Sequence, residues 1–541
     1  MYGIRKLGLL AATLATLNGA LAADAVDANT INRIADEGYN HGQVVSLAAY
    51  LSDRIGGRMT NSPAMRQAEQ WTQQMFGSWG LQNVHKEGFE FGRGWWIESS
   101  SARMVAPRPR TLTAIPVAWT PATKGTLSAP IVVAPIRHER DLAQWKGKLK
   151  GKIVLVSYPD DPKDDTTGPF KRYDDAELGK LNTYDQPHFD PDEAADFYRN
   201  YFERAQAINR FMAAEGAVAL VKMSYRSGGL VQGEGYFHQK GATLPLPEVE
   251  MAAEDYRRLA RLARVPNAGE VKLELNNNVH FDDRDSNAYN VFAEIPGSDP
   301  QAGYVMAGAH LDSWVAGDGS ADNGAGSVVV MEAARILSTL GVKPKRTIRF
   351  ALWAGEEQGL LGSLAYIRQH IATRPAPLDP VQAKMPEFMR ETWPVTPLPG
   401  FKDMTAYFNL DNGSGKIRGI YAEGNFAAIP VLKGWLAPFD SLGANLVVAK
   451  KTGGTDHEIM AAMGLPAFQF IQDPLDYGSR VHHSNLDTFD HLRTEDLRQA
   501  AVVMATVLLQ AAETATPLPR NVLPRQPAPT NPFKYRDPAK D

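Results

Sequence analysis

The sequence predicts an α/β fold, in which helices flank a mainly parallel, mixed sheet and a β-rich region is inserted ahead of most of that sheet. Two observations support the sheet. From about residue 271 to residue 515, short and largely apolar runs alternate with helical patterns. One of those patterns, over 327–340, ends at a glycine, which is a common helix stop signal. Strands and helices that alternate in this way form open sheets with a helical layer on each side.

Four apolar runs mark the strands expected in this sheet. They cover residues 304–309, 348–353, 406–410 and 467–471. Runs that are largely apolar along their length are typical of strands buried on both faces. Near the N-terminus, residues 27–80 show the apolar spacing of helices instead.

A second region, residues 111–266, has a different sequence pattern. Short apolar runs over 129–134 and 152–156 alternate with polar loops that are rich in proline and aspartate. The pattern predicts one clear helix in this region, over about 192–215. We therefore expect a separate β-rich domain here.

The N-terminus predicts export from the cytoplasm. Arg5 and Lys6 precede an apolar run over 7–17 and the small-residue site Ala20-Leu-Ala. This order is typical of a secretory signal, here 1–22, whose apolar core is too short to span a bilayer comfortably. We expect a secreted or periplasmic protein with no integral membrane segment after cleavage.

Composition excludes several classes of site. The chain has 541 residues, no cysteine and a formal net charge of -4. A disulfide framework, a thiolate zinc site and a cysteine nucleophile are therefore excluded. The weak charge gives no indication of a nucleic acid or a membrane surface as partner. The tail, 516–541, is rich in proline and charge, and we expect it to be extended or disordered.

Side chains that suit a metal follow the expected strands. In open α/β sheets, ligands bind just beyond the carboxyl ends of strands. The candidate residues at those places are His310, Asp312, Asp322, Glu356, Glu357, Asp411, His482 and His483. Alone, each has a simpler explanation, such as a buried histidine, a turn aspartate or the acidic first turn of a helix. Chance would scatter them along the chain, so their common placement favours a site.

This set of residue types favours zinc. Zinc binds imidazole nitrogen and carboxylate oxygen at about 2.0–2.2 Å. Two imidazoles and three carboxylates, one of them shared, can hold two ions about 3.5–4 Å apart. A further carboxylate is then needed to take a proton from the attacking water. The adjacent pair Glu356 and Glu357 project differently, so one can bind metal while the other stays free.

Five ordered motifs carry a resemblance to a known family. They are His310-Leu-Asp-Ser, Asp322-Asn-Gly-Ala-Gly, Glu356-Glu, Asn409-Leu-Asp and His482-His-Ser. The set resembles the di-zinc exopeptidases, which include bacterial leucyl aminopeptidases, glutamate carboxypeptidase II and carboxypeptidase Q. The residues in and around the first, third and fifth motifs are most similar to those of the carboxypeptidase Q branch. The resemblance covers most of 271–515.

The resemblance implies a metal ligand for each position. Asp322 would bridge two zinc ions. His310 and Asp411 would complete one site, and Glu357 and His483 would complete the other. The choice of the second histidine over its neighbour rests on the His-Ser step of the family motif.

The resemblance also implies roles around the metals. Glu356 would be the general base, and Asp312 would orient His310. Asp456, in a Gly-Gly-Thr-Asp-His loop, and His482 are weaker candidates for contact with substrate. Alternatively, Asp456 is only a turn residue, and His482 has only a structural role.

The resemblance further implies a domain plan. Residues 23–110 and 267–515 would form the di-zinc peptidase domain. Residues 111–266 resemble a protease-associated domain, on the evidence of the runs 151–157 and 215–221. In relatives such an insert borders the entrance of the active site and can narrow it.

The implied function is a secreted metallo-exopeptidase that hydrolyses short peptides, especially dipeptides. Two alternatives stay open: a carboxypeptidase for longer peptides, and a receptor-like binding protein that has kept the fold without catalysis. The sequence leaves open which peptide end is recognised, which side chain is preferred and whether the chain forms a homodimer.

Overall fold

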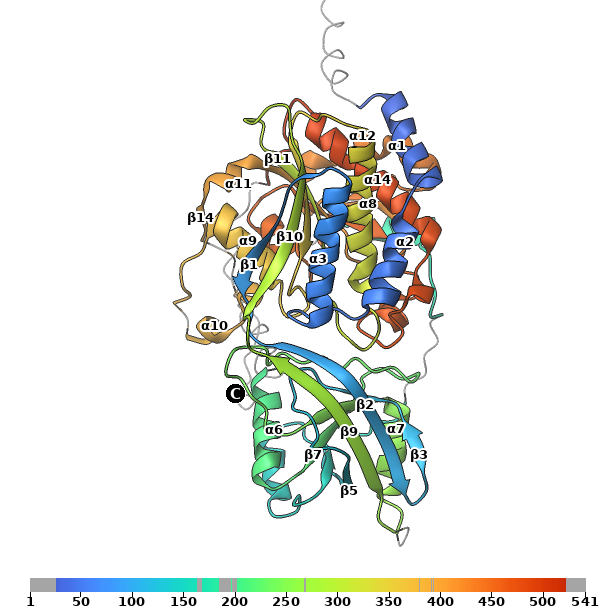
Figure 1. The fold of residues 1–541 in the computed structure, drawn as a ribbon, viewed down its shortest axis with the longest axis vertical. Coiled ribbons are helices and arrows are strands. Elements are labelled where there is room, and N and C mark those ends of the chain that lie inside the picture. Colours follow the sequence, from blue (N-terminus) through green and yellow to red (C-terminus); the bar gives the residue numbers. More distant parts are fainter. Residues whose placement is uncertain are drawn as a thin grey trace, which may run out of the picture.

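The computed structural model describes residues 26–162, 168–183, 196, 202–266, 269–378, 380–390, 392 and 394–521. The expected signal segment 1–22 lies outside these residues, as do most of the tail and much of the helix expected over 192–215. Two bodies are stacked along the long axis, and each contains a sheet of eight strands (Figure 1). No helix among the described residues is both long and apolar enough to cross a membrane.

The upper body contains a mixed sheet with a parallel centre. In spatial order its strands are β1 (Gln82–Glu90), β10 (Asn287–Ile295), β12 (Thr347–Trp353), β11 (Tyr304–His310), β15 (Met404–Asn409), β18 (Ala467–Gln472), β16 (Ile417–Tyr421) and β17 (Leu446–Val448). The four central strands, from β12 to β18, are parallel. β1 and β10 pair antiparallel with their neighbours, whereas β16 is antiparallel to β18 and parallel to β17. The predicted fold class is confirmed, and all four expected strands lie in this parallel centre.

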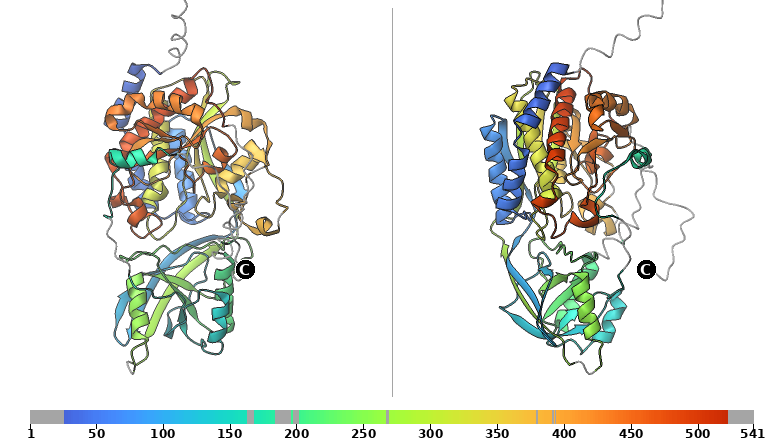
Figure 2. Two further views of the ribbon diagram at one scale, coloured as in Figure 1. Left: turned by 180° about the vertical axis from the view of Figure 1, so that it is seen from behind. Right: turned by 90° about the vertical axis from the view of Figure 1, so that its right-hand side faces the viewer.

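Helices cover both faces of the upper sheet (Figure 2). One layer contains α1 (Ala28–Asn40), α2 (Val44–Ala49), α3 (Pro63–Ser78), α8 (Ala325–Thr339), α12 (Ile429–Leu436) and α14 (Thr494–Glu513). The opposite face packs against α9 (Leu361–Tyr366) and α13 (Glu458–Ala462). Helix α8 is buried from Ala325 to Leu337 because it lies between the sheet and the outer helices. Its apolar sequence, unbroken by charge until Glu332, fits that position.

The lower body contains the inserted domain. Its strands, in spatial order, are β3 (Arg110–Leu112), β2 (Gly94–Ala106), β9 (Lys272–Asp282), β5 (Leu127–Val133), β6 (Ile153–Leu155), β7 (Ala219–Met223), β8 (Glu248–Met251) and β4 (Ala114–Pro116). Helices α6 (Arg204–Ala214) and α7 (Ala253–Leu262) pack beside this sheet. The long strands β2 and β9 lie outside the expected range 111–266. Both strands carry polar runs, of serine in β2 and of asparagine in β9, which lack the apolar pattern that marks a strand.

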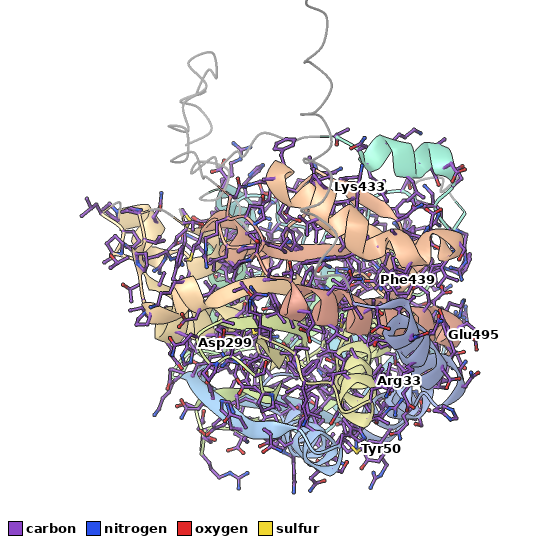
Figure 3. All side chains as sticks on the ribbon, turned by 90° about the horizontal axis from the view of Figure 1, so that it is seen from above. Arg33, Tyr50, Asp299, Lys433, Phe439 and Glu495 are labelled. Carbon is purple, nitrogen blue, oxygen red and sulfur yellow. The ribbon has the colours of Figure 1, made fainter. Side chains whose placement is uncertain are left out.

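The described chain also has several shorter α-helices and strands. They are α4 (Asp175–Leu181), α10 (Pro380–Lys384), α11 (Pro399–Asp403), β13 (Ala372–Thr373) and β14 (Thr396–Pro397). The segment that carries α4 lies against the upper body, where Lys171 pairs with Leu475. Arg33 and Lys433 are exposed and are labelled in the view from above, opposite the insert (Figure 3).

Candidate metal centre

The strand ends of the upper sheet bring the predicted site residues together. Strands β11, β12 and β15 run in one direction, and their carboxyl ends face the lower body. His310 ends β11, whereas Glu356 and Glu357 follow β12 and Asp411 follows β15. Asp322 lies in the turn before α8. The site therefore forms where the two bodies meet.

His310 is the centre of one half of the cluster. Its Nε2 atom lies 3.3 Å from Asp322 Oδ1 and 3.4 Å from Asp411 Oδ1. On the other side of the ring, Nδ1 donates a 2.9 Å hydrogen bond to the backbone oxygen of Asp312. This bond occupies Nδ1, so Nε2 is the nitrogen that faces the two carboxylates and is left to bind a metal.

His483 is the centre of the other half. Its Nε2 atom lies 3.1 Å from Glu357 Oε2 and 3.3 Å from Asp322 Oδ2. Asp322 thus presents one carboxylate oxygen to each histidine. The structure places this aspartate where a shared ligand would lie, between the two halves.

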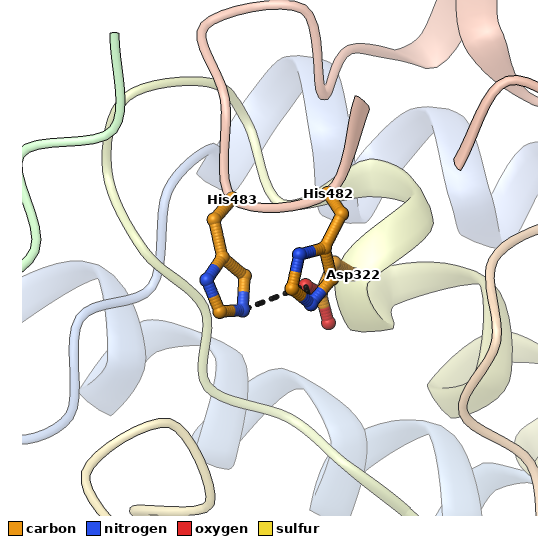
Figure 4. A group of neighbouring side chains, drawn as sticks. All are labelled: Asp322, His482 and His483. Atoms are coloured by element: carbon orange, nitrogen blue, oxygen red, sulfur yellow. Dashed lines mark ion pairs between the residues drawn. The ribbon is translucent and has the colours of Figure 1, made fainter. Parts of the chain in front are cut away.

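His482 lies beside its neighbour at the same loop (Figure 4). Its ring stacks on that of His483, with 3.6 Å between centroids and 21° between planes. Its Nε2 atom lies 3.7 Å from Asp322 Oδ2. Burial, together with the charge of His483, lowers the pKa of His482 to about 4, so the ring is neutral at neutral pH.

The chemistry of these donors fits divalent metal. Three oxygens, Asp322 Oδ2, Glu357 Oε1 and Asp411 Oδ1, are buried and make no hydrogen bond to a described residue. Buried carboxylates are unfavourable unless a cation or donors compensate them. One group of potential ligand atoms, within 4.8 Å of one another, comes from His310, Glu356 and Asp411, and another comes from His310, Asp322 and Glu357. The nitrogen and oxygen donors suit zinc.

Burial and like charges raise the pKa of several carboxyl groups here. Burial raises the pKa of Glu356 well above its usual range, and the charges of Asp411 and Asp456 act in the same direction. Burial raises the pKa of Glu357 to about 7, although His483 opposes the shift. Asp322 differs: burial would raise its pKa, but its hydrogen bond to His310 and the charges of the histidines around it together lower it. The cluster thus holds more negative charge than its own histidines neutralise.

Asp312 contacts a different partner from the one expected. Its carboxylate accepts hydrogen bonds from Thr60 Oγ1 at 2.9 Å and from the backbone N–H groups of Glu356 at 3.3 Å and Glu357 at 3.4 Å. Its Oδ1 atom lies 3.7 Å from His310 Nδ1, which binds the backbone oxygen instead. The side chain therefore fixes the glutamate turn, and the backbone of the same residue orients the histidine.

The Gly-Gly-Thr-Asp-His loop contributes one residue near the cluster. Asp456 is buried, and burial raises its pKa to about 7 while the charge of His310 opposes the shift. His457 instead turns toward Glu423, with 3.2 Å between Nε2 and Oε1.

Three supporting residues escaped the sequence analysis. Arg58, fully buried, donates from Nε to Leu311 O at 2.7 Å and from its two terminal nitrogens to the oxygens of Asp318 at 2.8 Å and Gly319 at 2.7 Å. Asp487 accepts from the backbone N–H of Asp322 at 3.1 Å.

The third, Glu234, comes from the insert and contacts His483 Nδ1 at 2.8 Å. The only local signal for it is the Gly-Glu-Gly step over 233–235, because none of the three lies in a motif.

Comparison with known proteins finds relatives of this chain. Residues 290–508 match the model of peptidase family M28. The chain is 27% identical to bovine (Bos taurus) carboxypeptidase Q over 474 residues, which cover 87% of this chain and 86% of the relative. It is 24% identical to human (Homo sapiens) carboxypeptidase Q over 518 residues, covering 96% and 95%.

Solved structures show the same fold. A peptidase M28 precursor from Shewanella amazonensis superposes with a TM-score of 0.63 and 24% identity, covering 92% of this chain and 99% of that chain. A zinc aminopeptidase from Bacillus subtilis superposes with a TM-score of 0.54 and 18% identity, covering 88% and 97%. The resemblance drawn from the five motifs is thereby confirmed: residues 290–508 match peptidase family M28, and the chain is similar over most of its length to carboxypeptidase Q.

Proposed function

We propose that this peptidase is a secreted or periplasmic exopeptidase that hydrolyses short, unblocked peptides, dipeptides above all, with two zinc ions per chain. The observation that carries the proposal is the position of Asp322, whose two carboxylate oxygens each lie 3.3 Å from a different histidine. His310 and Asp411 would hold one ion, and Glu357 and His483 would hold the other. The signal-like sequence over 1–22 supports export.

Glu356 is the group left for proton transfer. Its Oε2 atom lies 3.9 Å from His310 Nε2, farther than the oxygens of Asp322 and Asp411. When bound, the zinc ions would polarise the scissile carbonyl and lower the pKa of the attacking water. Glu356 would accept a proton from that water and deliver it to the leaving amine. Asp312 orients Glu356 by accepting from its backbone N–H.

Two residues are positioned to contact substrate. Asp456 is a buried carboxylate close enough to His310 and Asp411 to share their electrostatic field, and we assign it to the free ammonium group of the peptide. His482 is 36% exposed on its side chain and lies beside Asp322, and we assign it to the oxygen of the scissile carbonyl. Neutral His482 would donate one N–H to that oxygen as negative charge develops.

The insert supports the preference for short peptides. Its Tyr236 packs edge-on against Trp314 of the upper body, with 5.7 Å between ring centroids, and Trp314 in turn packs against His483 at 6.2 Å. Aromatic side chains from both bodies therefore lie next to the metal ligands. A folded protein chain would have to displace the insert to reach them.

The experiment that tests the function combines metal and product analysis. We expect about two zinc ions per purified chain by mass spectrometry, and turnover of free dipeptides that stops after chelation and returns with zinc. Acetylating the peptide N-terminus should remove most of the turnover, whereas blocking the C-terminus distinguishes an aminopeptidase from a carboxypeptidase. Equal cleavage of acetylated and free peptides refutes ammonium recognition, and internal cleavage of long chains refutes the exopeptidase assignment.

A further inference from the structure

The loop that carries His483 is held by the inserted domain. Asn485 and Val231 exchange two hydrogen bonds, from Val231 N to Asn485 Oδ1 at 3.0 Å and from Asn485 N to Val231 O at 3.1 Å. Arg226 donates to the backbone oxygen of His482 at 3.0 Å. The metal-ligand loop of the upper body therefore rests on the 226–234 segment of the lower body.

The same segment reaches the metal ligand itself. Glu234 Oε1 lies 2.8 Å from His483 Nδ1, on the side of the ring opposite Glu357 and Asp322. A carboxylate can only accept this bond, so Nδ1 carries a proton and Nε2 is the nitrogen left to bind a metal. A charged acceptor at Nδ1 makes the ring a stronger ligand than a carbonyl would.

The insert fixes the position of Glu234 from both sides. A Cβ atom on Gly235 would lie 2.3 Å from Ala118 O, and one on Gly233, whose φ is 73°, would lie 2.9 Å from Pro116 O. Only glycine lets the backbone approach this closely. The two glycines of the Gly-Glu-Gly step thus let the 226–234 segment and Gly235 pack closely against residues 116–118, at the end of β4.

Charged residues within the insert add to this support. Lys222 donates to the backbone oxygen of Glu234 at 3.3 Å. Glu250 accepts from the backbone N–H of Gln232 at 2.9 Å and forms an ion pair with Lys222 at 3.2 Å. Glu234 is therefore held in place by a network that lies wholly in the lower body.

We propose that Glu234 is a positioning residue of the metal centre, through which the inserted domain completes the zinc site of His483; this inference rests on the two-zinc function proposed above. It acts through His483 by fixing the tautomer and the direction of Nε2. Removing it weakens one metal site and spares the other, because His310 obtains its Nδ1 acceptor from its own strand end.

The test measures zinc affinity rather than activity alone. Metal-free wild type, Glu234→Ala and Glu234→Gln are titrated with zinc against a chelator of known affinity. We expect two tight zinc ions in the wild type, and in Glu234→Ala a loss of about 10- to 100-fold in the affinity for one of them, with the other unchanged. Glu234→Gln should lose less, because the amide oxygen still accepts from Nδ1. Glu139→Gln, at an exposed position of the same domain, removes an equal charge and should bind zinc like the wild type.

Thermal unfolding without and with zinc separates this role from a structural one. Thermal unfolding of the metal-free proteins should give similar midpoints for the wild type and Glu234→Gln, whereas the stabilisation by added zinc should be smaller in both Glu234 variants. Two zinc ions bound with unchanged affinity in Glu234→Ala and Glu234→Gln, or equal weakening of both sites, overturn the inference alone. Fewer than two zinc ions in the wild type overturn the proposed function, and the inference with it.

Discussion

The two histidines of the candidate metal centre are supported in different ways. His310 ends a central strand, and its Nδ1 hydrogen bond goes to the backbone two residues further on. His483 lies in an irregular loop with a left-handed backbone (φ 60°), and its Nδ1 contact comes from the other body. The half of the site around His310, the sheet half, is therefore positioned by the sheet. The half around His483, the insert half, depends on how the two bodies meet.

Asp322→Asn is the change that should abolish the distinction between the halves. Asp322 faces both histidines, so the amide removes a charged oxygen from each side at almost unchanged shape. We expect both zinc affinities to fall, and turnover to fall further than the roughly 100- to 10,000-fold expected when only a general base is lost. Metal analysis after dialysis and dipeptide turnover measure this. Retention of one ion at full affinity would show that the aspartate serves a single half.

Glu356→Gln and Glu357→Gln form a matched pair that separates catalysis from metal binding. Glu356→Gln should reduce kcat by about 100- to 10,000-fold with both zinc ions retained, because the amide cannot accept a proton. Glu357→Gln should lose the ion of the His483 half, since Glu357 lies 3.1 Å from that ring. The opposite pattern, with metal lost from the first variant only, would exchange the two roles.

The sheet half is the part that the sequence predicts well. Largely apolar runs identify strands buried on both faces, and parallel strands deliver the residues that follow them to one edge. His310, Glu356 and Asp411 meet there for that reason. The fold class follows from the same pattern.

The insert half is predicted less well, because it depends on contacts between bodies. The Gly-Glu-Gly step around Glu234 does not indicate that its side chain faces His483, a residue 249 positions away. The selection of His483 over His482 rested on a family motif. Arg58 and Asp487 were missed for a related reason, since a buried residue that binds backbone groups of a distant turn has no sequence pattern of its own.

Arg58→Met should reveal how much stability the sheet half derives from one side chain. The guanidinium is fully buried and binds the backbone oxygens of Leu311, Asp318 and Gly319, which the thioether would leave unpaired. We expect the free energy of unfolding of the metal-free protein to fall by about 3–5 kcal/mol. Arg226→Met, the matched change on the insert side, removes one bond to His482 O from a partly exposed residue and should cost about 1 kcal/mol. Urea unfolding compares the two, and equal losses would contradict the difference in support.

His238 should make the junction of the two bodies sensitive to acid. Its ring stacks on Phe91 with 4.3 Å between centroids and donates from Nδ1 to Phe91 O at 2.8 Å. Burial lowers its pKa to about 4 from the usual 6.5, although the hydrogen bond opposes the shift. Between those values only the unfolded chain binds the proton, so this contribution to stability is complete above about pH 6.5 and is lost as the pH falls toward 4. The loss should reach at most about 3 kcal/mol.

His238→Phe keeps the stacking but cannot titrate, and it should flatten the fall in urea stability between pH 6.5 and 4. The same substitution at exposed His41 should leave that fall unchanged. If the urea stability of His238→Phe falls with pH as steeply as that of the wild type, acid acts on other groups, and the contact of His238 with Phe91 is not the acid-sensitive part of the junction.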